Sequence, residues 1–193
     1  MHVTDESLML AVRDGDLAQL EPLFERHHAA LFEFLSRMTG DRGAADDLVQ
    51  DVFLRILTYR ATFRDDGCFD TWVFRIARNA RADHLRARSR VTALTDDHLD
   101  RPDRSAGPAL QLERSRDHAR LRRALALLPD DERELIVLAR YCGMTHAQSA
   151  EILGTTIGAV KVRLHRAVRA LRDIFLRLPD ERHSWDVKRS TGN

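Results

Sequence analysis

The chain has 193 residues with a formal net charge of +1, and its 44% hydrophobic content suits one large folded domain or two small ones. No run approaches the roughly 20 apolar residues of a membrane helix, and acids precede the only short apolar run at the start. Neither a membrane span nor a signal peptide is therefore expected, and a cytoplasmic protein is expected by default. Two cysteines without paired spacing and nine scattered histidines predict neither a disulfide framework nor a metal site.

The first sixty residues predict three helices with an acidic surface. Thr4 is expected to cap a short helix ending near Gly15, and Asp16 to cap a longer helix ending at Gly40. A third helix follows over 44–60. Residues 1–60 hold six basic and eleven acidic residues, a balance of −5. These acids either stabilise helix dipoles or form a docking surface for a basic partner, and charge alone leaves both explanations open.

A loop over 61–68 leads into a strongly basic helix that extends to about residue 90. Its expected inward positions are Trp72, Val73, Ile76, Ala77, Ala80 and Leu85. Arginines occupy the other faces from residue 71 onward, and Asp83 is the only acid among them. Arginine at this density, beside Phe63 and Phe69 of the loop, favours phosphate contact and stacking on unpaired bases.

Residues 91–116 interrupt the helical pattern. They contain Pro102, Gly107 and Pro108 with several aspartates and little apolar periodicity, which is typical of a flexible linker. The helical pattern resumes at Asp117. The predicted fold is therefore all-α, with two small helical domains joined by a linker. The predicted boundaries are 1–90, linker 91–116, 117–178 and a polar tail over 179–193.

The stretch 145–172 carries the most specific pattern in the chain. Thr145 and Gln148 predict a capping box, and Gly154 suits a left-handed helix stop before a second helix. The expected inward stripe of that helix is Ile157, Val160, Leu164, Val168 and Leu171. Residues 155–178 hold six basic residues and one acid, a balance of +5. A helix, a glycine turn and a basic second helix are typical of helix-turn-helix readers of the DNA major groove.

Four segments, taken in this order, resemble the bacterial extracytoplasmic-function (ECF) sigma factors: LVQDVFLRI, FDTWVFRIARNARADHLR, LPDDERELIVL and GTTIGAVKVRLHRAVRAL. The resemblance covers about 20–90 and 118–174. It implies two helical domains, region two and region four, without a region three between them. It also implies binding to core RNA polymerase, at the beta-prime clamp helices and the beta flap, and to promoter DNA. An anti-sigma factor is an expected regulator, and neither a cofactor nor a catalytic activity is expected.

The resemblance also assigns residues to each surface. Polymerase binding maps onto Asp47, Gln50, Asp51 and Phe53. Minus-ten recognition and strand opening map onto Phe63, Arg64, Phe69, Arg75, Arg78, Asn79 and Arg86, with Asn79 at a base-contacting position. Minus-thirty-five recognition maps onto Thr156, Lys161, Val162, Arg163, His165 and Arg166. Two residues depart from the family pattern. Position 162 is commonly a small polar residue but is Val162 here, and position 149 is usually aliphatic but is Ser149 here.

Three other classes of protein are alternatives to this interpretation. A helix-turn-helix transcriptional regulator that does not replace the sigma subunit is the main one, but it needs a sensor half of alternating strands and helices, and residues 1–90 predict helices only. An enzyme is disfavoured because the sequence has no nucleophile and base pair, no metal-ligand spacing and no phosphate-cradling glycine loop. A structural adaptor leaves the two basic clusters without a purpose. Polymerase binding separates a sigma factor from the regulator.

Overall fold

A computed structural model describes residues 3–92 and 109–179, and every regular element in these two ranges is helical. The α-helices are α1 (Asp5–Arg13), α2 (Leu20–Thr39), α3 (Arg42–Tyr59), α4 (Phe69–Thr92), α5 (Ala109–Ala126), α6 (Asp130–Ile136), α7 (His146–Leu153) and α8 (Ile157–Arg177). Three short turns accompany them: the 3-10 turns η1 (Leu17–Gln19) and η2 (Arg60–Thr62), and the π-helical turn η3 (Val137–Tyr141). The predicted all-α class is confirmed. No helix in the described ranges is long and apolar enough to cross a membrane.

Local capping residues determine where most of these helices begin and end. The side chains that accept a hydrogen bond from a backbone N–H three residues later are those of Thr4, Asp41, Thr145 and Thr156. Gln148 completes the predicted capping box with Thr145. Gly40 and Gly154 have φ angles of +72° and +64°, a conformation that glycine adopts without steric cost, and they end α2 and α7 as predicted.

The first domain consists of α1 to α4 around one buried core. Its fully buried large side chains include Met9, Leu23, Leu31, Phe34, Leu35, Ile56, Phe63, Phe69 and Phe74. One predicted core position is wrong: Leu85 is 39% exposed, because α4 continues beyond the part of the helix that packs against α2 and α3.

The second domain consists of α5 to α8 around a smaller core. The buried side chains are Leu125, Leu128, Leu135, Ile136, Ala150, Val160, Leu164 and Ala167. The predicted stripe of α8 is only partly right, since Ile157 and Val168 are 46% and 40% exposed. The stripe that packs inward continues from Leu164 to Ala167 instead. A small residue there lets α8 approach its neighbours closely, and residue 168 lies about 100° further around the helix.

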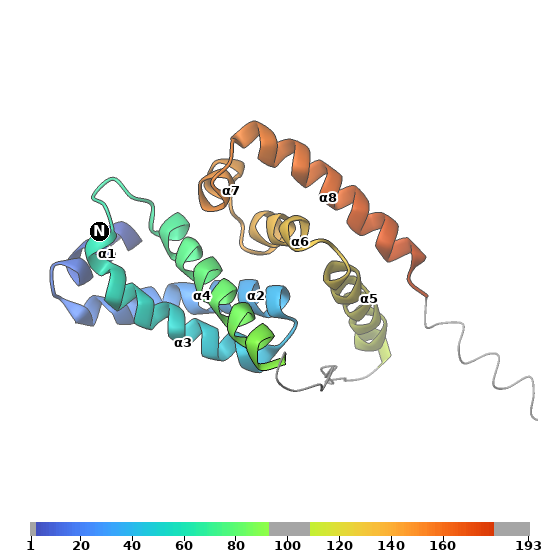
Figure 1. The fold of residues 1–193 in the computed structure, drawn as a ribbon, viewed down its shortest axis with the longest axis horizontal. Helices are drawn as coiled ribbons and strands as arrows, with labels where there is room; N and C mark the ends of the chain where they lie inside the picture. The colour runs from blue at the N-terminus through green and yellow to red at the C-terminus, as the bar shows by residue number, and fades with distance from the viewer. Residues whose placement is uncertain (1–2, 93–108, 180–193) are drawn as a thin grey trace, which may run out of the picture.

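The two domains lie against each other rather than apart. In Figure 1 the helices α1 to α4 form one group and α5 to α8 a second, with α4 at the boundary. There α4 contacts α7, and α2 contacts η3. Val137, Leu138, Met144 and Ile152 of the second domain belong to the same buried cluster as the core of the first. The Arg37 guanidinium also lies over the Tyr141 ring, 3.6 Å from its centroid.

The predicted linker over 91–116 is shorter in the structure, because α4 extends to Thr92 and α5 begins at Ala109. Its central part, 93–108, lies outside the described residues. The same holds for the predicted tail beyond Pro179.

Candidate nucleic-acid interface

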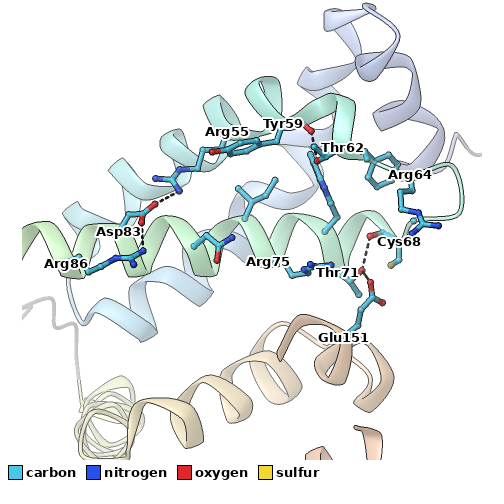
Figure 2. Close-up of a pocket in the computed structure, with 15 residues that line it drawn as sticks. Arg55, Tyr59, Thr62, Arg64, Cys68, Thr71, Arg75, Asp83, Arg86 and Glu151 are labelled. Carbon is cyan, nitrogen blue, oxygen red and sulfur yellow. Dashed lines mark hydrogen bonds and ion pairs between the residues drawn. The ribbon is translucent and has the colours of Figure 1, made fainter. Parts of the chain in front are cut away.

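A pocket of about 720 Å³ lies between α3, the loop after η2, and α4 (Figure 2). The lining side chains come from three segments of the first domain and from one helix of the second domain. They are Arg55, Tyr59, Thr62, Phe63, Arg64, Gly67, Cys68, Thr71, Trp72, Arg75, Ile76, Asn79, Asp83, Arg86 and Glu151. The combination of arginines, aromatic rings and an asparagine suits a nucleic-acid base together with its phosphates.

Four of the seven residues predicted for minus-ten recognition line this pocket as accessible side chains: Arg64, Arg75, Asn79 and Arg86. Phe63 and Phe69 do not present accessible rings, since these residues are 2% and 0% exposed. The two rings meet edge to face at 6.3 Å and both contact Trp72. The prediction that these two phenylalanines stack on bases is therefore not supported by their position. They hold the ends of the loop in the core instead.

Arg78, the remaining predicted minus-ten residue, faces the second domain. Its Nε and Nη2 bond the Glu134 carboxylate at 2.7 and 3.2 Å, and its Nη1 donates to the Ile152 carbonyl at 2.8 Å. Arg81, which the sequence pattern did not single out, is 8% exposed and donates to both carboxylate oxygens of Asp130 at 2.6 and 2.7 Å. Two arginines of α4 are thus bound by acids of α6.

The second domain also reaches the edge of the pocket. Figure 2 shows Glu151 extending from α7 toward Thr71, whose hydroxyl donates to the carboxylate at 2.9 Å. Nearby, the Gln148 amide lies 3.9 Å from the Cys68 sulfur. A carboxylate at this position repels the phosphate groups of any nucleic acid that enters the pocket.

On the other side of α3, the predicted polymerase-binding residues differ in exposure. Asp47 and Gln50 are exposed, and Leu54, one turn further along the helix, is 64% exposed. Phe53 is 7% exposed and packs edge to face with Phe24 at 4.9 Å, so it supports this surface from beneath.

Asp51, the fourth predicted polymerase-binding residue, forms an ion pair with Arg55 at 2.9 Å. Arg55 continues the chain of ion pairs to Asp83 at 2.7 Å, and Asp83 accepts from Arg86 at 2.6 Å. The hydrogen bonds from Arg55 and Arg86 lower the pKa of Asp83. This chain links α3 to α4 along one side of the pocket.

The helix-turn-helix consists of α7 and α8, and most of its predicted reading residues are exposed on α8. Lys161, Val162, His165 and Arg166 are exposed, with Val162 at 53%. Thr156 caps the helix instead, and its hydroxyl accepts from the Ala159 N–H at 3.1 Å. Arg163 forms an ion pair with Asp131 of α6 at 2.8 Å. The exposed residues form a short basic strip with one apolar position.

Ser149 of α7, one of the two departures noted in the sequence, is completely buried and its hydroxyl has no hydrogen-bond partner among the described residues. Because a buried unpaired hydroxyl destabilises the folded state, Ser149→Ala is expected to raise the free energy of unfolding by about 1 kcal/mol. Urea denaturation measures this change. Ser36→Ala is the matched control, since the Ser36 hydroxyl donates to the Glu33 carbonyl at 3.3 Å and its removal should give no gain. A loss of stability in Ser149→Ala would show that the hydroxyl has a partner.

Comparison with known proteins assigns both halves of the chain. Residues 23–91 match the family model of Sigma-70 region 2, and residues 118–171 match that of Sigma-70, region 4. The ECF RNA polymerase sigma factor ShbA of Streptomyces griseus is 38% identical over 162 residues, which cover 81% of this chain and 83% of that protein. The ECF RNA polymerase sigma factor SigF of Caulobacter vibrioides is 36% identical over 174 residues, covering 87% and 92%.

Two solved structures share the arrangement of both domains. CnrH in complex with the cytosolic domain of CnrY gives a TM-score of 0.68 at 28% identity, covering 88% of this chain and 96% of that one. The sigma factor RpoE in complex with the anti-sigma factor NepR from Bartonella quintana gives 0.64 at 25% identity, covering 82% and 98%. These similarities extend across the boundary between the two domains.

Proposed function

This chain belongs to the ECF RNA polymerase sigma factors, and we propose that it divides promoter recognition between the pocket of the first domain and helix α8 of the second. It binds core RNA polymerase, directs the enzyme to specific promoters and helps to open the DNA. It performs no catalytic step itself and acts in the cytoplasm, where the polymerase works. One observation carries the proposal: a pocket rimmed by arginines and large enough to admit a base, and an exposed basic recognition helix, occur in the same chain.

In the first domain, the pocket receives an unpaired base of the minus-ten element. Asn79 lies in its wall and offers both a hydrogen-bond donor and an acceptor to the edge of a base. Arg75 makes no ion pair with another described residue and is free to contact a phosphate. Trp72 contributes an aromatic wall. Capture of the base in this pocket stabilises the opened strand.

In the second domain, α8 reads the minus-thirty-five element in the major groove. Arg166 can donate two hydrogen bonds to a guanine edge, whereas Val162 offers only an apolar contact to a thymine methyl. Lys161 and His165 flank them on the same exposed strip. Because Val162 stands where a small polar residue is common in the family, this chain prefers a promoter base that presents a methyl group at that position.

Core polymerase docks on the exposed side of α3, through Asp47 and Gln50. Leu54 supplies an exposed apolar anchor for this surface. Apolar side chains that become buried within a polar rim commonly supply much of the binding energy of an interface. The main alternative, a helix-turn-helix regulator that leaves the sigma subunit in place, gives this surface no partner.

DNA binding requires the two domains to separate. Arg78 and Arg81 cannot contact phosphates while Glu134 and Asp130 bind them, and Glu151 lies at the edge of the pocket. The described arrangement is thus a closed form, and the polymerase or the promoter stabilises an open one. An anti-sigma factor that favours the closed form would keep the protein inactive, and the similarity to RpoE bound to NepR supports such a partner.

Glu134→Gln is expected to raise the affinity of the isolated protein for promoter DNA about tenfold, because it weakens a charge-assisted contact that holds the closed form. Fluorescence anisotropy with labelled promoter DNA measures the affinity. Glu132→Gln is the matched control, since it removes the same charge from α6 at a half-buried residue that makes no hydrogen bond or ion pair with the described part of the first domain. Equal gains in the two variants would mean that net charge alone is responsible and that closure does not oppose DNA binding.

Run-off transcription tests the whole proposal. Purified core polymerase without any sigma subunit is mixed with this protein and a library of candidate promoters. Specific transcripts that require the protein support the sigma function and give the promoter sequence at the same time. Binding to duplex DNA without association with polymerase would favour the regulator instead.

A further inference from the structure

Helix α1 lies outside the residues that match the region 2 model, yet it is in contact with the loop that borders the base pocket. One side of α1 buries Leu8, Met9 and Val12 in the core of the first domain. Two polar side chains of α1 contact the loop instead. Arg13 and Glu6 reach the two ends of the loop over 63–69, fifty or more residues further along the chain.

At the front end of the loop, one nitrogen of Arg13 makes two contacts. Its Nη1 donates to the Phe63 carbonyl at 3.2 Å and forms an ion pair with the Asp65 carboxylate at 2.5 Å. The Nε of Arg13 is bound separately to Asp14 at 3.1 Å. The contact with Asp65 is the main reason that the pKa of Arg13 is raised. The backbone at Phe63 is therefore held by a side chain from outside the pocket.

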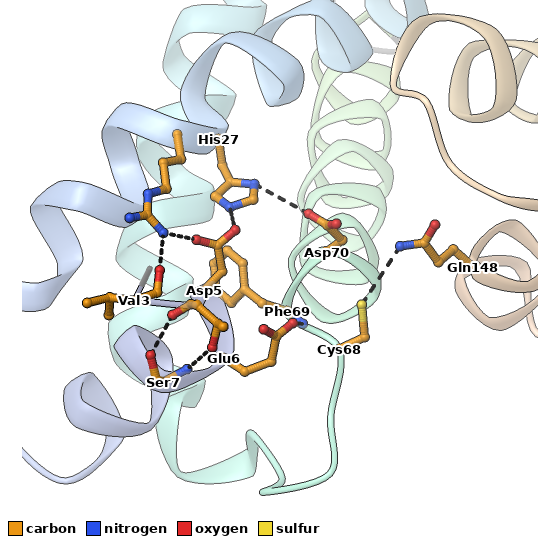
Figure 3. A network of polar contacts seen from close by, with 11 residues as sticks. Val3, Asp5, Glu6, Ser7, His27, Cys68, Phe69, Asp70 and Gln148 are labelled. Carbon is orange, nitrogen blue, oxygen red and sulfur yellow. Dashed lines mark hydrogen bonds and ion pairs between the residues drawn. The ribbon is translucent and has the colours of Figure 1, made fainter. Parts of the chain in front are cut away.

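At the rear end of the loop, Glu6 accepts a hydrogen bond from the Phe69 backbone N–H at 3.3 Å (Figure 3). The neighbouring Asp5 accepts from His27 Nε2 at 2.8 Å, and the other ring nitrogen of His27 lies 3.5 Å from Asp70. Figure 3 shows His27 between these two carboxylates, which links α1 to the first turn of α4. Both ends of the loop are thus fixed to the same helix.

Between these fixed ends the loop borders the pocket. The side chains of Arg64 and Asp66 are 80% and 78% exposed and pair with each other at 3.2 Å. Gly67 makes the turn that follows, and a side chain there would meet the Arg64 carbonyl at 3.0 Å. A loop of this kind has no regular backbone hydrogen bonding to set its distance from α4. The contacts at Phe63 and Phe69 supply that constraint.

We infer that α1 is a positioning element for the base pocket, in which Arg13 and Glu6 hold the loop at the distance from α4 that lets the pocket distinguish one base from another. The inference rests on the proposed base-binding function of the pocket. It makes Arg13 and Glu6 positioning residues, since neither lines the pocket or touches the base. A purely structural role for α1, burial of its apolar side, predicts a different result.

The test is base discrimination by the full-length protein assembled with core polymerase. Each minus-ten position of an active promoter is replaced in turn, and the ratio of transcripts from the parent and substituted promoters identifies the base that the pocket holds. This ratio is a property of the active molecules. A variant that merely lowers the folded fraction reduces both transcripts equally and leaves the ratio unchanged.

Arg13→Met and Glu6→Ala are expected to lower the discrimination ratio at that one position about fivefold, the factor that corresponds to one hydrogen bond. Asp65→Ala, at a side chain that is 79% exposed, should lower it in the same direction without endangering the fold. Glu6→Gln keeps an oxygen that can accept from the Phe69 N–H and should restore the ratio. Asp14→Ala leaves both loop contacts of Arg13 intact and should not change it.

Full discrimination in Arg13→Met, Glu6→Ala and Asp65→Ala would overturn the positioning role of α1 and leave the pocket function standing. Equal loss at every minus-ten position would also overturn it, because a misplaced loop affects the base that it borders. Absence of discrimination at any minus-ten position in the unmodified protein would refute the proposed pocket itself, and with it this inference.

Discussion

Cys142 is expected to react with iodoacetamide at pH 8 about a thousandfold more slowly in the folded protein than in the unfolded chain. The residue follows η3 at the boundary between the domains, and its sulfur lies 4.0 Å from the Ala30 carbonyl of α2. Burial raises the pKa of its thiol from 9.0 to about 12, and Glu33 adds to the increase. The thiolate is the form that reacts with iodoacetamide. Raising the pKa from 9.0 to about 12 lowers the thiolate fraction at pH 8 by about three powers of ten.

Reaction at Cys142 therefore measures how often the two domains separate. The experiment uses a Cys68→Ser background, so that Cys142 is the single remaining thiol, and follows labelling by mass spectrometry with and without urea. Addition of core polymerase or the Glu134→Gln substitution should accelerate labelling of the folded protein, because both favour the open form. Equal rates in the folded and unfolded chains would show that the closed form is sparsely populated.

The raised pKa of Cys142 also gives the pH dependence of closure. Below about pH 9 the thiol is protonated whether the domains are closed or open, so closure does not depend on its ionisation. Between pH 9 and about pH 12 the Cys142 thiol is ionised in the open form but still protonated in the closed form. Ionisation in this window therefore favours separation of the domains, and Cys142 labelling should rise more steeply than the thiolate fraction of a free cysteine.

The sequence predicted the helices well because their ends depend on neighbouring residues. Thr4, Gly40, Thr145 and Gly154 act within three or four residues of their own positions, and each occupies the expected helix end. The loop before α4, in contrast, is held by residues that are distant in the sequence. The helix begins at Phe69, directly after the predicted loop, but nothing near Phe69 in the sequence indicates that its ring is buried in the core or that its N–H is bound by Glu6 of α1.

The candidate site was predicted in composition but not in arrangement. An arginine-rich helix that also carries Asn79 was enough to indicate nucleic acid, and several of these residues do line the pocket. The pairing of Arg78 and Arg81 with the second domain left no local signal, because Glu134 and Asp130 lie about fifty residues away and look like ordinary acids of a short helix. One clue was present: α6 begins with an acidic run, DDERE, that includes both partners.

Phe63 and Phe69 illustrate a second feature that could not be predicted from the sequence, namely whether an aromatic ring is exposed. Exposed aromatic residues beside arginines are typical of single-strand binding, but the sequence does not say whether a loop aromatic faces solvent or the core. Both residues end the loop, and each continues the buried face of the helical element next to it. The position of a phenylalanine at the junction of a loop and a helix therefore indicates an anchor as readily as a stacking platform.

The second large effect concerns Arg166, whose replacement by alanine is expected to weaken binding to the minus-thirty-five element by about 1 to 3 kcal/mol, or about five- to 150-fold. Arg166 is exposed on α8 and forms no ion pair with another described residue, so its guanidinium is free to bind a base. The loss should disappear on DNA in which the contacted base pair is already changed, because that DNA offers no partner to the arginine. Holoenzyme binding to parent and substituted promoters measures both quantities.

Arg169→Ala is the matched control, since Arg169 is also exposed on α8, about one turn further along the helix, where we expect it to meet the backbone of a bound duplex. A phosphate contact carries no sequence information, so Arg169→Ala should weaken binding to all promoters by a similar factor and reduce the dependence of affinity on salt. Arg166→Ala should instead remove discrimination at one base pair. If both variants weaken every promoter equally, α8 contributes only charge, and sequence at the minus-thirty-five element is read through DNA shape or by residues outside this strip.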